Sequence, residues 1–119
     1  MSNPSVTILI SSDVVPTVSN EHLFISGDVD ALVGKRIQEL FSESDFSSIN
    51  LECALTTTDN PILKCGPNLK AHPEAINGIK ALNPSLIGVA NNHIMDFGKE
   101  GLDDTLRVLG NHNLPFIGV

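Results

Sequence analysis

The chain has 119 residues, of which 41% are hydrophobic and 4% aromatic, so it can form one small domain with an aliphatic core. Its formal net charge of -7 argues against binding to nucleic acid or anionic lipid, because both favour basic surfaces. No stretch approaches the roughly 18 apolar residues that cross a membrane, and no signal-peptide pattern opens the chain. Cys53 and Cys65 are predicted to be reduced thiols, with a disulfide between them the less favoured alternative, so a cytoplasmic location is expected.

The first half of the chain predicts three strands and one helix. Residues 6–10 are short, β-branched and apolar, which is typical of a strand buried on both faces in a parallel sheet. Two further strands are expected at 22–26 and 46–51. Asp30 can cap a helix over 30–43. The apolar face of that helix comprises Leu32, Val33, Ile37, Leu40 and Phe41.

The second half of the chain predicts an irregular segment over 56–72, a helix over 73–82, a strand over 86–90, a helix over 99–109 and a strand over 116–119. Strands that alternate with helices imply right-handed crossovers and a mostly parallel sheet with flanking helices. The predicted fold class is therefore α/β.

Polar side chains gather at the carboxyl ends of three predicted strands, which is the edge where open α/β sheets bind ligands. They are Asp13 after the first strand, Asn50 and Glu52 at the end of the third, and Asn91, Asn92 and His93 after the fourth. Each of these residues alone could be a turn former or a surface residue. Their convergence on one edge of the sheet predicts a site.

The chemistry of these side chains suits a divalent metal ion. Carboxylate and carboxamide oxygens together with one imidazole fit Mg²⁺, Mn²⁺ or Fe²⁺ better than an ion that prefers thiolates. Such an ion could polarise a phosphoryl or carbonyl oxygen. His93 is then the candidate proton donor to a leaving group, and Asp96 the carboxylate that orients its imidazole.

An ordered series of motifs runs through the chain from about Phe46 to Val119. They are Asn-Leu-Glu at 50–52, Pro-Ile-Leu-Lys at 61–64, Gly-Pro-Asn-Leu-Lys-Ala at 66–71, Ala-Asn-Asn-His at 90–93, Asp-Phe-Gly at 96–98 and Gly-Leu-x-x-Thr at 101–105. This series resembles the bacterial capsule-synthesis CapA family of poly-γ-glutamate biosynthesis. The resemblance implies a fold similar to calcineurin-like metallophosphoesterases, an α-β-β-α sandwich with a metal centre between its sheets, of which this chain would form the N-terminal half.

The resemblance also implies roles for single residues. Asp13 stands where the first metal-binding Asp lies, although Val15 replaces the usual His and Asp28 is a rival for the position. Glu52 is similar to the metal-bridging carboxylate and Asn92 to the metal-binding Asn, with His93 as the transition-state acid. Lys64 and Asn91, within the family motifs, are the predicted contacts to an anionic or polyglutamate-like substrate.

The family domain is longer than this chain, and its remaining part supplies further metal-binding histidines. Residues 1–119 are therefore expected to be one incomplete domain, inactive alone or completed by another copy or another chain. The leading prediction is metal-assisted hydrolase chemistry at a phosphoryl or amide carbonyl centre in capsule or poly-γ-glutamate metabolism. The alternatives are a generic metallophosphoesterase that acts on a small phosphate ester, and a non-catalytic scaffold that retains the fold.

Overall fold

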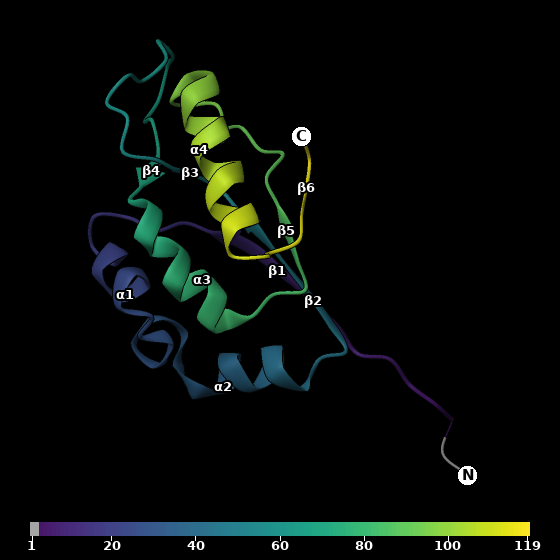
Figure 1. Ribbon diagram of the computed structural model, residues 1–119. Helices are drawn as coiled ribbons and strands as arrows, with labels where there is room; N and C mark the ends of the chain where they lie inside the picture. Colours follow the sequence, from purple (N-terminus) through teal and green to yellow (C-terminus); the bar gives the residue numbers. More distant parts are fainter. Residues whose placement is uncertain (1–2) are drawn as a thin grey trace.

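The computed structural model describes residues 3–119 and shows an α/β fold (Figure 1). Met1 and Ser2 lie outside the described residues. They belong to the N-terminal stretch in which the sequence shows no signal-peptide pattern. The strands are β1 (Ile8–Val14), β2 (Phe46–Leu51), β3 (Ala54–Leu55), β4 (Lys70–Ala71), β5 (Leu86–Gly88) and β6 (Phe116–Ile117). The helices are α1 (Glu21–Ser26), α2 (Val29–Glu43), a 3₁₀ helix (Pro73–Ala75), α3 (Ile76–Leu82) and α4 (Gly98–Asn111). Within residues 3–119, none of the helices has the length and apolar character needed to cross a membrane.

Four strands form one parallel sheet in the order β1-β2-β5-β6, and β3 and β4 form a separate parallel pair. The predicted α/β class, with a mostly parallel sheet and flanking helices, is confirmed. Along the chain, each strand of the main sheet pairs with the strand before it, and the sheet grows in one direction from β1 to β6. Right-handed crossovers between strands in such an order place all the connecting helices on the same face of the sheet. One helix-covered face and one open face are consistent with half of a two-sheet sandwich.

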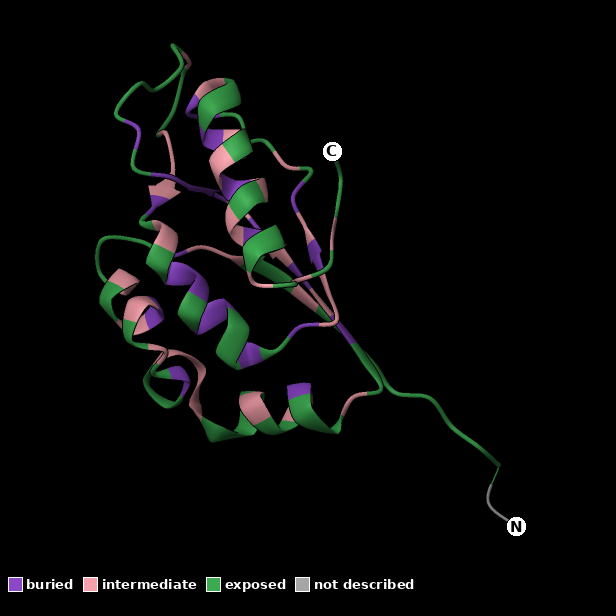
Figure 2. Cartoon of the chain, in the orientation of Figure 1, coloured by how far each residue is buried: buried purple, intermediate pink, exposed green. Residues whose placement is uncertain are grey.

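The hydrophobic core lies between the helices and one face of the main sheet. In β2, Ile49 and Leu51 are buried, whereas the residues that alternate with them are more exposed. Figure 2 shows the buried positions along α3 and on the neighbouring strands. Where the helix over 73–82 was predicted, its four main apolar residues are all buried: Ala75, Ile76, Ile79 and Leu82.

Residues 21–26 form helix α1, so the strand predicted at 22–26 is wrong. A short apolar run does not distinguish a strand from a buried helical turn. Here tertiary packing decides, because Phe24 is buried against α3, where a Cβ added to Gly78 would lie 2.7 Å from the Phe24 Cα. Gly27 ends the helix in the left-handed region, with φ 71°.

Strand β1 is longer and more exposed than predicted. It continues to Val14, so Asp13 lies within the strand and not after it. Ile8 and Ile10 are 60% and 78% exposed, which contradicts the prediction of a strand buried on both faces. The reason is its position at the edge of a sheet that helices cover on one face only.

Helix α2 begins one residue earlier than predicted and has a different cap. Asp28, not Asp30, accepts a hydrogen bond from the backbone N–H of Ala31 at 3.1 Å. Gly34 interrupts the helix with φ 76° and ψ 162°. The kink changes the helical register, and on the predicted apolar face Ile37 remains 40% exposed.

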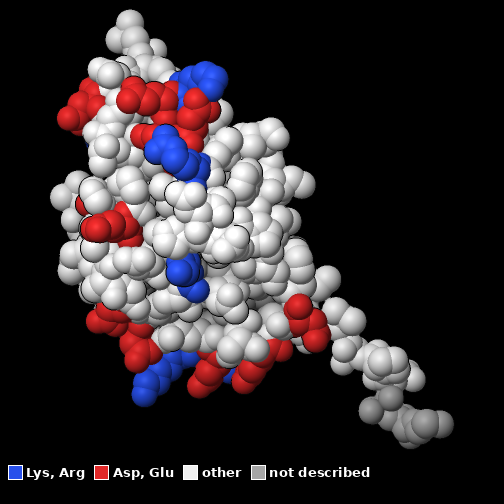
Figure 3. All heavy atoms as spheres, viewed as in Figure 1, with Lys and Arg blue, Asp and Glu red and all other residues white. Residues whose placement is uncertain are grey.

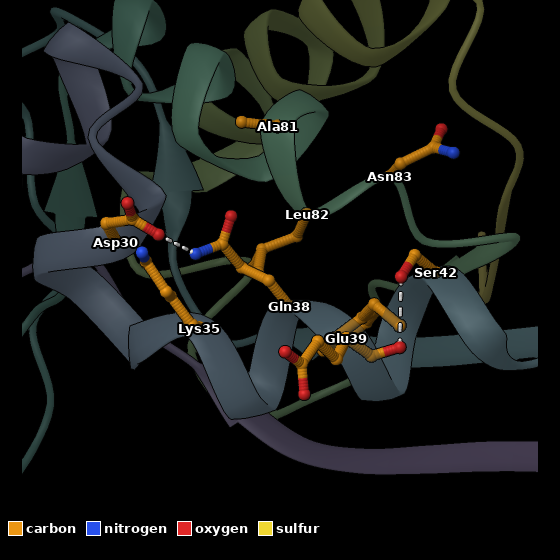
Figure 4. Close-up of a pocket in the computed structure, with 9 residues that line it drawn as sticks. Asp30, Lys35, Gln38, Glu39, Ser42, Ala81, Leu82 and Asn83 are labelled. Carbon is orange, nitrogen blue, oxygen red and sulfur yellow. Dashed lines mark hydrogen bonds between the residues drawn. The ribbon is translucent and has the colours of Figure 1, made fainter.

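A hollow of about 370 Å³ lies between α2 and the end of α3 (Figure 4). Its polar lining includes Asp30 and Gln38, which are hydrogen-bonded to one another, and Lys35 beside them. These helices end where β2 and β5 are about to begin, so the hollow is at the amino end of the sheet. None of the residues predicted from sequence to form a site line it.

The remaining boundaries differ by a few residues from the predicted ones. The predicted irregular segment 56–72 contains β4, which pairs with β3, and the helix predicted at 99–109 extends over Gly98–Asn111. Both cysteines are free: Cys65 is exposed, whereas Cys53 is buried. Burial, together with the nearby negative charges of Glu21 and Glu52, raises the pKa of the Cys53 thiol to about 12.

Candidate functional site

The loop after β5 is held by the side chain of Asn91. Its Oδ1 accepts hydrogen bonds from the backbone N–H groups of His93 and Ile94, both at 3.0 Å. Its Nδ2 donates to the backbone carbonyl of Leu51 at 2.8 Å and to Asn50 Oδ1 at 3.1 Å. A carboxamide offers two donor and two acceptor positions, so this one is fully used within the chain. Asn91 thereby joins the loop to the end of β2.

A second carboxamide extends this connection to β1. Asn50 Nδ2 donates to Asp13 Oδ1 at 2.7 Å, and the two residues are partners in the β1–β2 register. Gly88 of β5 is the register partner of Asn50 on the other side. The carboxyl ends of three adjacent strands are therefore joined through Asp13, Asn50 and Asn91, as the convergence of polar residues in the sequence predicted.

Asp96 is the centre of a second group of contacts and is completely buried. Its Oδ2 lies 2.7 Å from His93 Nδ1 and its Oδ1 lies 2.5 Å from Lys64 Nζ. Lys64 Nζ is also 3.4 Å from His93 Nδ1. The contact that the sequence predicted between Asp96 and His93 is present, and Lys64 forms a salt bridge with the same carboxylate.

Two further hydrogen bonds fix the chain around this carboxylate. The backbone N–H of Leu69 donates to Asp96 Oδ2 at 2.7 Å, and Asn68 Nδ2 donates to the backbone carbonyl of Asp96 at 2.9 Å. Burial alone would raise the pKa of the Asp96 carboxyl. The hydrogen bonds from Lys64, His93 and Leu69, with the positive charge of Lys64, outweigh that effect and hold the pKa below its usual range.

Asn68 and Leu69 were not predicted from the sequence as residues that support the site. The available signal was their place in the Gly-Pro-Asn-Leu-Lys-Ala motif at 66–71. The long segment before β4 is also tied to α4, because Thr56 Oγ1 donates to Asp104 and Thr58 Oγ1 donates to Glu100. The segment that the sequence predicted to be irregular is thus bonded both to α4 and to Asp96.

The three predicted metal ligands make no hydrogen bond to Asp96, His93 or Lys64 within residues 3–119. Asn50 bonds to Oδ1 of Asp13, so the Oδ2 of Asp13 does not take part in that hydrogen bond. Glu52 lies just beyond β2, where its backbone N–H donates to the Val14 carbonyl at 3.2 Å. Asn92 is exposed. Within residues 3–119 the side chains of Glu52 and Asn92 make no hydrogen bond, so their oxygens are available.

These oxygen donors fit a hard divalent cation in their chemistry but supply only two charged ligands. No group of three or more His, Cys, Asp or Glu side chains that could hold a metal ion occurs among residues 3–119. A metal ion bound here would need ligands in addition to Asp13, Glu52 and Asn92. The rival Asp28 has a structural contact of its own, since its carboxylate caps α2.

A cleft of about 580 Å³ lies next to the loop that supports Asp96. Leu69 and Phe97, the residues bonded to or adjacent to Asp96, are part of its wall. The Lys70 ammonium lies 5.0 Å from the centroid of the Phe97 ring, within range of a cation–π interaction. Glu21 also lines the cleft, and its Oε1 accepts a hydrogen bond from the backbone N–H of His72 at 2.6 Å.

Comparison with known proteins shows which proteins this chain resembles. A probable polyglutamine synthesis accessory protein of Mycobacterium tuberculosis is 33% identical over 75 residues, which is 63% of this chain and 20% of that protein. The PGA biosynthesis protein CapA of Bacillus subtilis is 30% identical over 83 residues, 69% of this chain and 22% of that protein. The capsule biosynthesis protein CapA of Bacillus anthracis is 25% identical over 118 residues, 83% of this chain and 29% of that protein.

The chain thus spans between 20% and 29% of the length of these curated relatives. The family model described as bacterial capsule synthesis protein PGA_cap matches residues 8–119, which include both hydrogen-bonded groups of the site. Because this match covers nearly the whole chain, the chain belongs to the bacterial capsule synthesis protein family.

Proposed function

We propose that this chain carries part of a metal-assisted hydrolase site that acts on a phosphoryl or amide carbonyl centre in capsule or poly-γ-glutamate metabolism. The observation that supports it best is the contact among His93, Asp96 and Lys64 at the end of β5. A buried ionised carboxylate is costly unless it is paired. A buried carboxylate that is hydrogen-bonded to a partly exposed imidazole is an arrangement typical of catalytic histidines.

His93 is the proposed proton donor to the leaving group. Its Nδ1 faces Asp96 at 2.7 Å, so Nε2 is the ring nitrogen left to meet a substrate. The imidazole is 12% exposed, which leaves it a small opening to the surface. Asp96 would stabilise the ring orientation, and positioned general acids of this kind contribute roughly 10²–10⁴-fold to a rate.

Asn91 and Lys64, both predicted from sequence to contact substrate, have positions that favour different tasks. The Asn91 amide is fully used by four hydrogen bonds, so we assign it to positioning of the loop. Lys64 holds Asp96, but its side chain is 20% exposed and its positive charge could still attract an anionic group. A polyglutamate-like polymer would supply such groups.

The proposed metal ligands are Asp13, Glu52 and Asn92, completed by ligands from outside the 119 residues of this chain. A bound Mn²⁺, Mg²⁺ or Fe²⁺ would polarise the oxygen of the centre under attack and lower the pKa of bound water. The residues of this chain would hold the ion at the carboxyl ends of β1 and β2, beside His93 and its partners.

Metal binding is testable with the chain itself by calorimetric titration with Mn²⁺. We expect weak binding that is lost in the double variant Asp13→Asn with Glu52→Gln, while the control Asp28→Asn with Glu74→Gln, which removes the same charges elsewhere, binds as before. Identical isotherms for all three proteins would contradict the ligand assignment.

The role of His93 is testable in a protein that contains this chain together with the ligands that complete its metal site, assayed on a chromogenic phosphodiester and on a γ-glutamyl anilide, each in the presence of Mn²⁺. We expect His93→Ala to lower the rate on one of them at least about 100-fold, while His22→Ala, at an exposed histidine of α1, keeps it. The substrate that responds identifies phosphoryl or amide chemistry. Unchanged activity of His93→Ala on both substrates would show the acid assignment to be wrong.

A further inference from the structure

The end of the long segment before β4 donates a hydrogen bond to every oxygen atom of Asp96. The backbone carbonyl oxygen of Asp96 accepts from the Ile62 N–H at 2.8 Å and from Asn68 Nδ2 at 2.9 Å. Its Oδ1 accepts from Lys64 Nζ at 2.5 Å, and its Oδ2 accepts from the Leu69 N–H at 2.7 Å. One short stretch of the chain thus fixes both the main chain and the carboxylate of Asp96.

This stretch, residues 62–69, is closed at its base by the side chain of Asn68. Besides its bond to Asp96, Asn68 Nδ2 donates to the backbone carbonyl of Ile62 at 3.0 Å. A carboxamide nitrogen carries two N–H groups, and here each has a carbonyl acceptor. The amide of Asn68 therefore ties the beginning of the stretch to its end and ties both to Asp96.

The tip of the stretch projects from the domain. Leu63 is fully exposed and Cys65 is exposed as well. In Figure 3 the tip, which lies at the top as in Figure 1, is uncharged, and charged side chains gather below it around the start of α4. Lys64 is the single charged residue of the stretch, yet its side chain is only 20% exposed. Because the tip is not buried, the hydrogen bonds at the base decide where Lys64 lies.

The contact with Lys64 also fixes the direction of the Asp96 carboxylate. A carboxylate held through one oxygen can still turn about its Cβ–Cγ bond. In Asp96, Lys64 holds Oδ1 while the Leu69 N–H holds Oδ2, the oxygen that lies 2.7 Å from His93 Nδ1. With a donor on each oxygen, the carboxylate keeps Oδ2 directed at the imidazole.

We propose that Asn68 is a positioning residue, which closes the stretch and thereby holds Lys64 against Asp96. Through that carboxylate it orients the imidazole of His93, so the inference rests on the proposed role of His93 as the proton donor. Loss of the Asn68 amide leaves two carbonyl oxygens without their donor and frees the base of the stretch to open.

Acetylation of lysines by acetic anhydride, read by mass spectrometry, tests the first step in the chain alone. Lys99, whose side chain is 80% exposed, is the internal reference for Lys64. We expect Asn68→Ala to raise the acetylation rate of Lys64 relative to that of Lys99 about 10-fold, because the opened stretch releases Lys64 from Asp96.

The matched control is Asn60→Ala, at an exposed residue of the same long segment whose Nδ2 makes one bond of 3.4 Å to Thr58 Oγ1. It should leave Lys64 as protected as in the unchanged chain. Asn68→Gln keeps the amide and should restore part of the protection. Circular dichroism should show cooperative unfolding of all three variants. Full protection of Lys64 in a folded Asn68→Ala chain would overturn the proposal.

The catalytic consequence is tested in a protein that contains this chain together with the ligands that complete its metal site. We expect Asn68→Ala to lower kcat about 10-fold without a change in KM, because Asn68 acts through Asp96 and not on the substrate. Asn68→Gln should recover part of the rate. Adding Asn68→Ala to Lys64→Met should lower kcat no further than Lys64→Met alone, since both changes remove the same contact.

These measurements separate the inference from the proposed function. If His93→Ala keeps the full rate, the proposed function fails, whatever the acetylation rates are. If His93→Ala is slow, the inference fails when Asn68→Ala keeps its full kcat or when its effect multiplies with that of Lys64→Met. Asn68 also lines the cleft beside the site, so a raised KM with unchanged kcat would identify it as a substrate contact and contradict the positioning role.

Discussion

Two aspartate–lysine pairs show how burial changes the contribution of an ion pair to stability. Asp96 and Asp59 each lie 2.5 Å from a lysine Nζ, Lys64 and Lys70 respectively. The side chain of Asp96 is 0% exposed, whereas that of Asp59 is 93% exposed. An exposed pair is screened by water and contributes little, whereas removal of one partner of a buried pair leaves a charge without compensation. The Asp96 pair should therefore matter for stability and the Asp59 pair should not.

We expect Asp96→Asn to lower the free energy of unfolding by about 2–3 kcal/mol at pH 7, somewhat less than for a fully buried pair because Lys64 is partly exposed. The folded state lowers the pKa of Asp96, so its contribution is present above the unfolded pKa of about 3.9 and is lost as pH falls through the lower folded value. Urea unfolding of both proteins from pH 7 to acid should thus show the difference shrinking below about pH 4.

The control for this prediction is Asp59→Asn, which should leave the urea midpoint unchanged at neutral pH. Equal midpoints for the Asp96 variant and the unchanged chain would show that the salt bridge to Lys64 does not stabilise the loop.

At the scale of elements, helix α1 depends on one glycine of α3. A Cβ placed on Gly78 would lie 2.7 Å from both the Cα and the Cδ1 of Phe24. Side-chain carbons do not approach backbone atoms this closely, so the two helices can pack at their present distance only if residue 78 is glycine. Because α1 has only six residues, tertiary contacts such as this one, and not intrinsic helix propensity, keep it in place.

We expect Gly78→Ala to destabilise the chain by about 1–3 kcal/mol, since α1 must move away from α3. Gly110→Ala is the matched control: it lies in α4, a Cβ there meets no atom within 4 Å, and alanine is the better helix former. Thermal unfolding should show a lower Tm for the first variant and an equal or higher Tm for the second. An unchanged Tm for Gly78→Ala would mean that the helix contact can relax without cost.

The whole molecule has one core on one side of its sheet. Ile87 of β5 is completely buried beneath the helices, whereas Ile10 of β1 is 78% exposed on the face that the helices do not cover. Two isoleucines in neighbouring parts of one sheet thus have opposite surroundings. The sheet stabilises the monomer through its helix-covered face, and its open face contributes only when another surface covers it.

We expect Ile87→Ala to lower the free energy of unfolding by about 2–5 kcal/mol, the usual result of a large-to-small change in a core. Ile10→Ala should change it by less than about 0.5 kcal/mol when both are measured by urea unfolding at low micromolar concentration. A comparable loss for the two variants would indicate that another surface covers Ile10.

Much of this fold could be predicted from local patterns. The strands at 46–51 and 86–90 and the helices at 73–82 and 99–109 were found within a few residues, because apolar periodicity reports which face of an element is buried. The gathering of Asp13, Asn50 and Asn91 at one edge followed from the rule that parallel strands deliver their carboxyl ends to the same side. The direct contact between His93 and Asp96 also followed, since the two are three residues apart in one loop.

Other features depended on contacts between segments that are distant in the sequence. Residues 22–26 carry a short apolar run that suits a strand or a helix, and only Phe24 packing on Gly78 of α3 selects the helix. The salt bridge from Lys64 to Asp96 joins residues 32 positions apart, so no local pattern contains it. The sequence by itself determined most of the elements and the meeting of Asp13, Asn50 and Asn91 at one edge of the sheet, because periodicity and strand polarity are local properties. Only the tertiary structure decided which face of the sheet stays open and which lysine meets the buried carboxylate, because both follow from how the segments pack together.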